Sequence, residues 1–258
     1  MNDTGGSRMN TPLVSVVMPA YNAAKYVDKA IHSVLSQDDI DLELIIINDG
    51  SSDNTLEVLE QYKQYDNVTI MNNEQNLGVS ATRNKGIAHA KGKYIAFLDT
   101  DDWWTADKLK RQVELIEEKQ CVLTYTAREL FDDTGTPTGS VIPVHEEISY
   151  EELVKHNIIN CSSVLMDTNV AREFYMEHDD SHEDYLLWLK VLRKYKIAYG
   201  INEPLLKYRL SLNGKCRNKL KSARMTYRVH RYLGTNPVKS FFYMASQLVS
   251  AGLKYLKA

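Results

Sequence analysis

Short apolar runs alternate with amphipathic stretches through the first half of the chain. Residues 13–18 and 42–47 are nearly continuous apolar runs, the pattern of strands that are buried on both faces of a parallel sheet. Further strands are predicted at 68–71 and 94–98, and helices at 24–36, from Ser52 or Asp53, at 78–90, and at 106–119 with Thr105 as the cap. These four strand–helix units predict an α/β fold with an open, mostly parallel sheet. Ligands of such sheets bind beyond the carboxyl ends of the strands.

The second half of the chain has a less regular pattern. It predicts strands at 121–127 and 161–166, a turn-rich loop at 132–140, a short helix from Ser149 to 156, a helix at 184–195, a hairpin-like pair around 202–204, and helices at 215–232 and 238–257. We divide the chain into a flexible N-terminus (1–10), a main domain (11–212) with two halves (11–120 and 121–212), and a helical tail (213–258).

Composition narrows the class of protein. Apolar residues make up 43% of the 258 residues and charged residues 25%, which is typical of a globular protein rather than a disordered one. No apolar run approaches the roughly 18 residues of a membrane span, and the polar N-terminus does not look like a secretory signal. Cys121, Cys161 and Cys216 are too few and too far apart for a disulfide framework or a structural zinc site. A cytoplasmic protein is therefore expected.

Charge is distributed very unevenly. Residues 204–258 contain twelve Lys and Arg and no acidic residue, whereas the first 203 residues carry a net charge of −15. The tail also has a broad apolar band, which includes Phe241, Phe242 and Leu248. These features predict a helix pair that docks on an anionic membrane surface. The alternative is that the band packs on the main domain or on a second subunit in a homodimer.

An acidic triplet follows the predicted strand at 94–98. Asp99, Asp101 and Asp102 would repel one another unless a positive charge lay among them. A hard divalent cation such as Mg²⁺ or Mn²⁺ would fit this site and would also hold a diphosphate. The alternative is a solvated acidic turn in which Asp102 only caps the next helix.

Three other segments contain candidate site residues. Asp49 follows the strand at 42–47 and can accept a hydrogen bond from a nucleobase, although a turn with helix capping is the alternative. Arg83, on a predicted helix, can pair with phosphate or with the acidic triplet, or lie at the surface. Glu183 and Asp184 open an apolar helix, where a carboxylate serves either as a cap or as a general base.

Together these segments resemble the family 2 glycosyltransferases of the GT-A fold. The resemblance covers roughly residues 12 to 210 and rests on four motifs in family order: PLVSVVMPAYN, ELIIINDGSSDNT, NLGVSATRNKGIAHAKGKYIAFLDTDD and HEDYLLWLKVLRK. It implies a set of residues that bind the nucleotide sugar: Pro19, Ala20, Tyr21, Asp49, Arg83, Asp99 and Thr100. It also implies Asp101 as the metal ligand and Asp184 as the catalytic base, with Glu183 and Asp102 as secondary candidates.

The resemblance implies that the main domain (11–212) is a catalytic domain with a nucleotide-binding half (11–120) and an acceptor-binding half (121–212). It also implies an inverting, metal-dependent transfer. The donor would be a UDP-hexose or UDP-N-acetylhexosamine, and the cofactor Mn²⁺ or Mg²⁺. The acceptor would be a saccharide on a polyprenyl diphosphate, used in O-antigen, capsule or other surface-polysaccharide synthesis. The enzyme would then work in the cytoplasm, peripherally on the inner face of the plasma membrane.

Other functions fit the sequence less well. A phosphatase with an Asp-x-Asp motif would carry it on its first strand, and a nucleotidyltransferase would have a Gly-rich, Arg-containing loop where this chain has PAYN. A dinucleotide oxidoreductase would need GxGxxG, and a processive polysaccharide synthase would need membrane helices. A non-enzymatic nucleic-acid binder with a basic tail would have no use for an acidic crevice, so no nucleic-acid partner is expected.

Overall fold

The computed structural model describes residues 11–210 and 219–257, so the predicted flexible N-terminus and Lys215 and Arg217 of the tail lie outside the described residues. The first half alternates as predicted: β1 (Val14–Ala20), α1 (Val27–Leu35), β2 (Leu42–Asn48), α2 (Thr55–Glu60), β3 (Val68–Asn72), α3 (Val79–His89), β4 (Tyr94–Phe97), β5 (Trp103–Trp104) and α4 (Lys108–Lys119). Every residue of β2 is buried, as its nearly continuous apolar run predicts. Helix α4 begins after Asp107, so the prediction of Thr105 as its cap was wrong.

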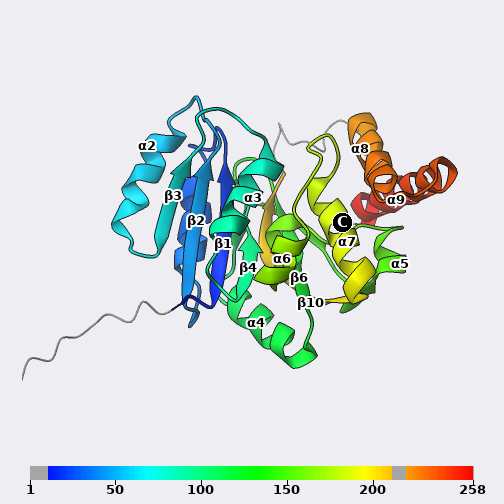
Figure 1. The fold of residues 1–258 in the computed structure, drawn as a ribbon, viewed down its shortest axis with the longest axis horizontal. Helices are drawn as coiled ribbons and strands as arrows, with labels where there is room; N and C mark the ends of the chain where they lie inside the picture. Colours follow the sequence, from blue (N-terminus) through cyan, green and yellow to red (C-terminus); the bar gives the residue numbers. More distant parts are fainter. Residues whose placement is uncertain (1–10, 211–218, 258) are drawn as a thin grey trace, which may run out of the picture.

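The described part of the chain forms one sheet of ten strands (Figure 1). Its main path runs β3-β2-β1-β4-β9-β6-β10-β5, with β7 and β8 paired at the side. The first four strands are parallel, as predicted. Beyond them the sheet is mixed, because β9 runs antiparallel to both β4 and β6. The carboxyl ends of β1, β2 and β4 therefore share one edge.

Up to the tail, the second half adds strands, three helices and one short 3₁₀ segment. Its elements up to the tail are β6 (Leu123–Phe131), β7 (Pro137–Ile142), β8 (Glu147–Ser149), α5 (Tyr150–Leu153), β9 (Leu165–Asp167), α6 (Thr168–Glu173), α7 (Glu183–Tyr195) and β10 (Ile197–Arg209). Ser149 caps α5 through a capping box with Glu152, as its position predicts. Two buried clusters cover the two faces of the sheet. One contains side chains of α3 and α7, and the other contains side chains of α1 and α4.

Two predictions in this half were wrong. The expected hairpin around 202–204 is part of the single strand β10. Its pairing with β6 shifts between Ile201 and Leu206, and this bulge accommodates Pro204, which has no N–H to donate. The expected strand at 161–166 begins instead with the 3₁₀ turn Cys161–Ser163, because the Asn160 side chain accepts a hydrogen bond from the backbone N–H of Ser162.

The described part of the tail packs against the catalytic domain. Helices α8 (Lys219–Tyr232) and α9 (Pro237–Lys257) lie together beyond α7, at the end of the molecule opposite α2 (Figure 1). Met225 and Val229 of α8 are buried, and Gln247 of α9 donates a hydrogen bond to the Tyr185 hydroxyl of α7. No helix within residues 11–210 and 219–257 is long and apolar enough to span a bilayer.

Candidate active site

A cavity of about 340 Å³ lies beyond the carboxyl ends of β1 and β2. It is lined by Pro19, Ala20, Tyr21, Asp49, Asn76, Gly78, Val79, Thr82 and Asp179. The structure thus brings together the first four of the predicted nucleotide-binding residues. The Tyr21 side chain is 51% exposed, so its ring is available to stack on a base.

Asp49 holds the wall of this cavity in place. It is buried, and its Oδ1 accepts hydrogen bonds from Asn73 Nδ2 (2.8 Å) and from the backbone N–H of Leu77 (2.9 Å). Its Oδ2 accepts one from the N–H of Gly78 at 3.0 Å. A carboxylate has about four acceptor positions, so Oδ2 retains the capacity to accept a hydrogen bond from a nucleobase. The anchoring of the loop before α3 was not foreseen from the sequence.

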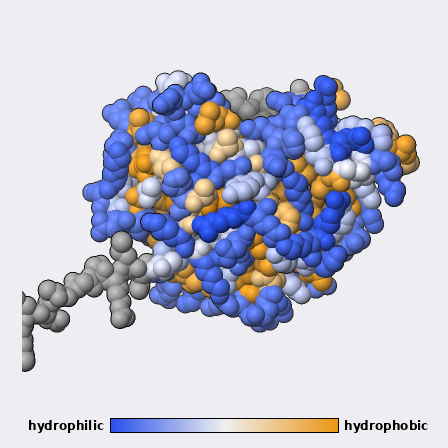
Figure 2. All heavy atoms as spheres, viewed as in Figure 1, coloured by the Kyte–Doolittle hydropathy of each residue, from blue (hydrophilic) through white to orange (hydrophobic). Residues whose placement is uncertain are grey.

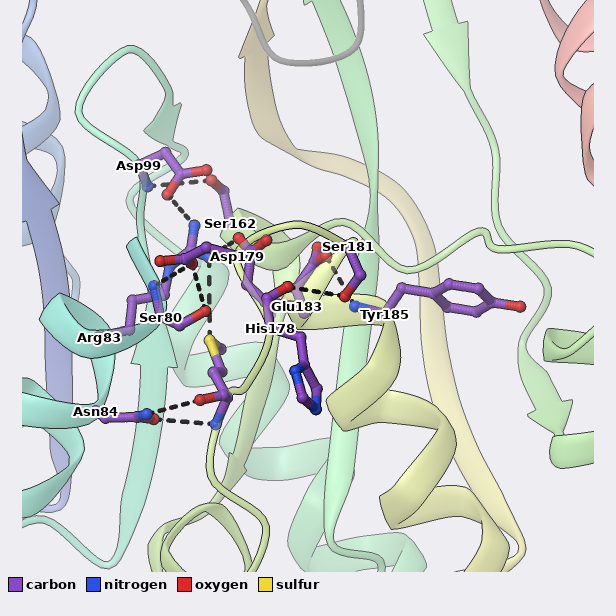
Figure 3. A network of polar contacts seen from close by, with 12 residues as sticks. Ser80, Arg83, Asn84, Asp99, Ser162, His178, Asp179, Ser181, Glu183 and Tyr185 are labelled. Atoms are coloured by element: carbon purple, nitrogen blue, oxygen red, sulfur yellow. Dashed lines mark hydrogen bonds and ion pairs between the residues drawn. The ribbon is translucent and has the colours of Figure 1, made fainter. Parts of the chain in front are cut away.

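Arg83 joins two motifs that are far apart in the sequence (Figure 3). Its Nη2 lies 2.5 Å from Asp99 Oδ1 at the end of β4, and its Nη1 lies 2.9 Å from Glu183 Oε1 at the start of α7. The Arg83 side chain is 4% exposed and that of Glu183 is 8% exposed, whereas Asp99 is 38% exposed. Arg83 therefore pairs with the acidic triplet, one of the alternatives that the sequence left open.

Asp101 and Asp102 differ in their surroundings. Asp102 is buried, and its Oδ1 accepts a hydrogen bond from the backbone N–H of Arg209 on β10 at 3.0 Å, so this residue supports the sheet. Asp101 is partly exposed, and burial together with the nearby charge of Asp99 raises its pKa to about 6. The structure thus places the Asp101 carboxylate next to that of Asp99, where little positive charge offsets its own. Thr100 lies between them and is also partly exposed.

The acidic groups fit a divalent cation that is bound together with a substrate. Within residues 11–210 and 219–257, no group of three or more His, Cys, Asp or Glu side chains is placed to hold a metal ion. Mg²⁺ and Mn²⁺ commonly take one or two carboxylates and complete their shell with phosphate oxygens and water. Asp101, with Asp99 beside it, offers such a partial set of ligands.

Asp184 lies at the second residue of α7. Its Oδ1 accepts a hydrogen bond from the backbone N–H of Tyr185 at 2.7 Å. Burial, and next the charge of Glu183, raise the pKa of the Asp184 carboxyl above its ordinary value. A raised pKa favours proton uptake near neutral pH, which is what a general base requires.

Two residues of this region were missed by the sequence analysis. Asp179 accepts hydrogen bonds from the backbone N–H (2.9 Å) and the hydroxyl (2.5 Å) of Ser80, and so ties the loop before α7 to the start of α3 (Figure 3). The acidic run around Asp179 and Asp180 was the available signal. Arg209 is buried beside the acidic triplet, with its guanidinium 5.0 Å from the centroid of the Trp103 ring. No local motif marks Arg209, because its partners are about 105 residues away in the sequence.

Comparison with known proteins places these features in a family. The family model described as "Glycosyl transferase family 2" matches residues 15–177. The chain is 39% identical over 221 residues to the putative teichuronic acid biosynthesis glycosyltransferase TuaG of Bacillus subtilis (strain 168), covering 85% of this chain and 88% of TuaG. It is 33% identical over 244 residues to the UDP-Glc:alpha-D-GlcNAc-diphosphoundecaprenol beta-1,3-glucosyltransferase WfgD of Escherichia coli, covering 93% and 94%.

Solved structures show the same fold. TarS of S. aureus (residues 1–349, in complex with UDP-GlcNAc) matches with a TM-score of 0.73 at 19% identity, covering 91% of this chain and 71% of that chain. The mannosyltransferase PcManGT of Pyrobaculum calidifontis, in complex with GDP-Man and Mn²⁺, matches with a TM-score of 0.70 at 14% identity, covering 92% and 70%. At these identities the likeness establishes the GT-A fold and nothing further about this chain.

Proposed function

Because the chain belongs to glycosyl transferase family 2, we propose that it transfers a hexose or N-acetylhexosamine from a UDP-sugar to a saccharide carried on a polyprenyl diphosphate. The printed names of WfgD, with its UDP-glucose donor and diphosphoundecaprenol-linked acceptor, and of TuaG support a role in surface-polysaccharide synthesis. The TarS complex with UDP-GlcNAc supports a UDP-sugar donor.

One observation carries this proposal. Arg83 bridges Asp99, which ends the strand beside the nucleotide cavity, and Glu183, which adjoins the candidate base Asp184. The residues proposed to hold the donor diphosphate and the residue proposed to deprotonate the acceptor therefore lie around a single guanidinium. A single-displacement transferase needs this arrangement, because donor and acceptor must meet at the anomeric carbon.

The proposed reaction is a single in-line displacement. The acceptor oxygen forms a bond to the anomeric carbon, the bond from that carbon to the diphosphate oxygen breaks, and the acceptor proton passes to Asp184. Asp101 and Asp99 would hold the divalent cation, which stabilises the negative charge of the departing UDP. The Mn²⁺ in PcManGT supports such a metal, although either Mn²⁺ or Mg²⁺ satisfies the chemistry.

We infer inversion of the anomeric configuration from the assignment of Asp184 as a base rather than as a nucleophile. Cys161 is buried near Arg83, but burial raises the pKa of its thiol well above the ordinary value, so the thiol stays protonated. With Asp184 assigned as the base, one displacement turns an α-linked donor into a β-linked product.

Release of UDP tests the proposal directly. The chain would be incubated with a panel of UDP-sugars and Mn²⁺ or Mg²⁺, with and without an N-acetylglucosamine-diphosphate lipid acceptor. We expect one UDP-sugar to give acceptor-dependent UDP release that stops in excess EDTA. Acceptor-dependent release that continues in excess EDTA would contradict the metal-dependent mechanism, and no release with any UDP-sugar would contradict the proposed donor.

The exposed face of α9 supports docking on an anionic membrane. Val238, Phe241, Phe242 and Val249 are each more than 55% exposed, although other side chains of α9 pack on α7. A small group of hydrophobic side chains is visible at the edge of this end of the molecule, and others are scattered over the rest of the face (Figure 2). Since residues 204–258 carry no acidic side chain, the charge of this segment is complementary to anionic lipid.

Vesicle sedimentation tests this docking. The chain should sediment with vesicles that contain phosphatidylglycerol and be released by about 0.5 M salt, which screens the lipid charge. Phe241→Ser/Phe242→Ser should lower binding by at least about tenfold, because each buried phenyl ring contributes more than about 1 kcal/mol. Truncation at residue 213 is a poor test, since it would also remove the buried Met225 and Val229.

Two results would contradict membrane docking. One is equal recovery in the supernatant with neutral and anionic vesicles at low salt. The other is that the unmodified chain forms a concentration-dependent dimer whereas the same double variant stays monomeric. That result would assign the exposed face of α9 to a second copy of the chain. Leu56→Ser is the matched control, because Leu56 is an exposed apolar residue of α2 at the other end of the molecule.

A further inference from the structure

A second cavity, of about 470 Å³, lies between α8 and the loop that precedes α7. Asp179, Asp180, Lys221, Arg224, Met225 and Arg228 line it. Asp179 also lines the nucleotide cavity, so the two cavities share a wall. The second cavity falls within the size range of small-molecule sites, roughly 300–1,000 Å³.

Three basic and two acidic side chains line this cavity, so its formal charge is +1. Lys221, Arg224 and Arg228 are spaced three and four residues apart, which places them on one face of α8. Arg228 is paired with Asp180 at 3.0 Å, and Asp179 is hydrogen-bonded to Ser80. Arg224 is exposed and has neither a hydrogen bond nor an ion pair with any residue that the structure describes. Its forked donors suit a phosphate group.

The second cavity lies apart from the expected position of the donor diphosphate. The donor diphosphate is expected at Asp99 and Asp101, whereas α8 lies on the far side of Asp179 from the nucleotide cavity. In the other direction α8 leads to α9, whose exposed face is apolar. A ligand that joins a diphosphate to a hydrocarbon chain would match both features.

We propose that this cavity, with Arg224 and Lys221 as its main contacts, binds the diphosphate of the lipid-linked acceptor. The inference deepens the proposed function and rests on it, since it identifies where the anionic part of that acceptor is held. Loop residues Asp179 and Asp180 precede Asp184 by only four or five positions. A diphosphate held on α8 would therefore lie beside the loop that leads to the candidate base at the start of α7.

Farnesyl diphosphate is a suitable probe, with farnesol as the matched compound that lacks the diphosphate. Its binding would be measured by calorimetry in the presence of saturating UDP and Mn²⁺, which occupy the donor site. We expect Lys221→Gln/Arg224→Gln to raise the Kd of farnesyl diphosphate about tenfold, as the loss of two exposed charged contacts predicts. Binding of farnesol should not change. Lys219→Gln, an exposed lysine outside the cavity, should have less than about a twofold effect.

Three results would overturn the inference. The Kd of farnesyl diphosphate could be the same in the double variant, or farnesol could bind the unmodified chain as tightly as farnesyl diphosphate does. A tenfold loss of UDP affinity in the double variant would instead assign the cavity to the donor. These outcomes are independent of turnover. An absence of UDP release with every UDP-sugar contradicts the proposed function, whereas charge-dependent binding of farnesyl diphosphate measures the cavity itself.

Discussion

Replacing Asp101 with asparagine should separate the role of this residue in catalysis from its effect on stability. Its pKa of about 6 lies above the ordinary value of 3.8, so the folded protein holds a proton at Asp101 more tightly than the unfolded chain does. The resulting cost to stability is absent below about pH 4, grows between pH 4 and 6, and is complete above pH 6. Two pH units correspond to at most about 3 kcal/mol.

Asp101→Asn removes this cost together with the charge. In the absence of metal at pH 7.5, the variant should have a larger free energy of unfolding than the unmodified chain, by about 1–3 kcal/mol. At pH 3 the two should differ by less than about 0.5 kcal/mol, because Asp101 is then mostly protonated in both the folded and unfolded states. Turnover should be lost, since an amide is a poor substitute for a carboxylate as a ligand of a hard cation.

Urea denaturation in EDTA at the two pH values measures the difference. Asp66→Asn is the matched control, because Asp66 is an exposed aspartate on the opposite side of β2 from the site motifs, and its replacement should change stability by less than about 0.5 kcal/mol. A variant that is no more stable than the unmodified chain at pH 7.5 would refute the electrostatic argument. Full turnover by Asp101→Asn would refute its role as the metal ligand.

Two further predictions concern the base and the metal. Asp184→Asn should lower kcat by at least about 10²-fold and leave the Kd of the UDP-sugar nearly unchanged, because an amide cannot accept the proton. A near-normal kcat would contradict the role of Asp184 as the general base. In the presence of a UDP-sugar, Mn²⁺ should bind about tenfold more weakly at pH 5 than at pH 7, because a proton competes for Asp101, whose pKa is about 6. Titration of Mn²⁺ by paramagnetic relaxation at both pH values checks this, and an affinity independent of pH would contradict it.

The elements that the sequence predicts well are those whose pattern is local. Strand β2 is buried along its whole length, and its nearly continuous apolar run is sufficient to predict it. The bulged strand β10 could not be predicted, because Pro204 and its neighbours resemble a turn. They remain in a strand only because β6 pairs with both sides of the bulge. The residues of β6 that keep this segment in a strand therefore lie about 75 positions earlier in the sequence.

The same distinction holds for the candidate site. Asp99, Asp101 and Asp184 were identified from short motifs, because each stands directly at the end of a strand or the start of a helix. The motifs do not reveal which charged side chains pair with one another. That Arg83 contacts both Asp99 and Glu183, and that Asp102 is turned toward β10, follow only from the packed structure.

Arg83 explains why the two carboxylate motifs can be held so close together. Its guanidinium is almost fully buried, and each of its two terminal nitrogens contacts a different carboxylate. Loss of this arginine would leave Glu183 buried without its cation, which is far more costly than the loss of an exposed ion pair. Arg83 therefore positions α7, and with it Asp184, relative to the end of β4. In this arrangement one side chain, Arg83, links the strand end that carries the proposed metal ligands to the helix start that carries the proposed base.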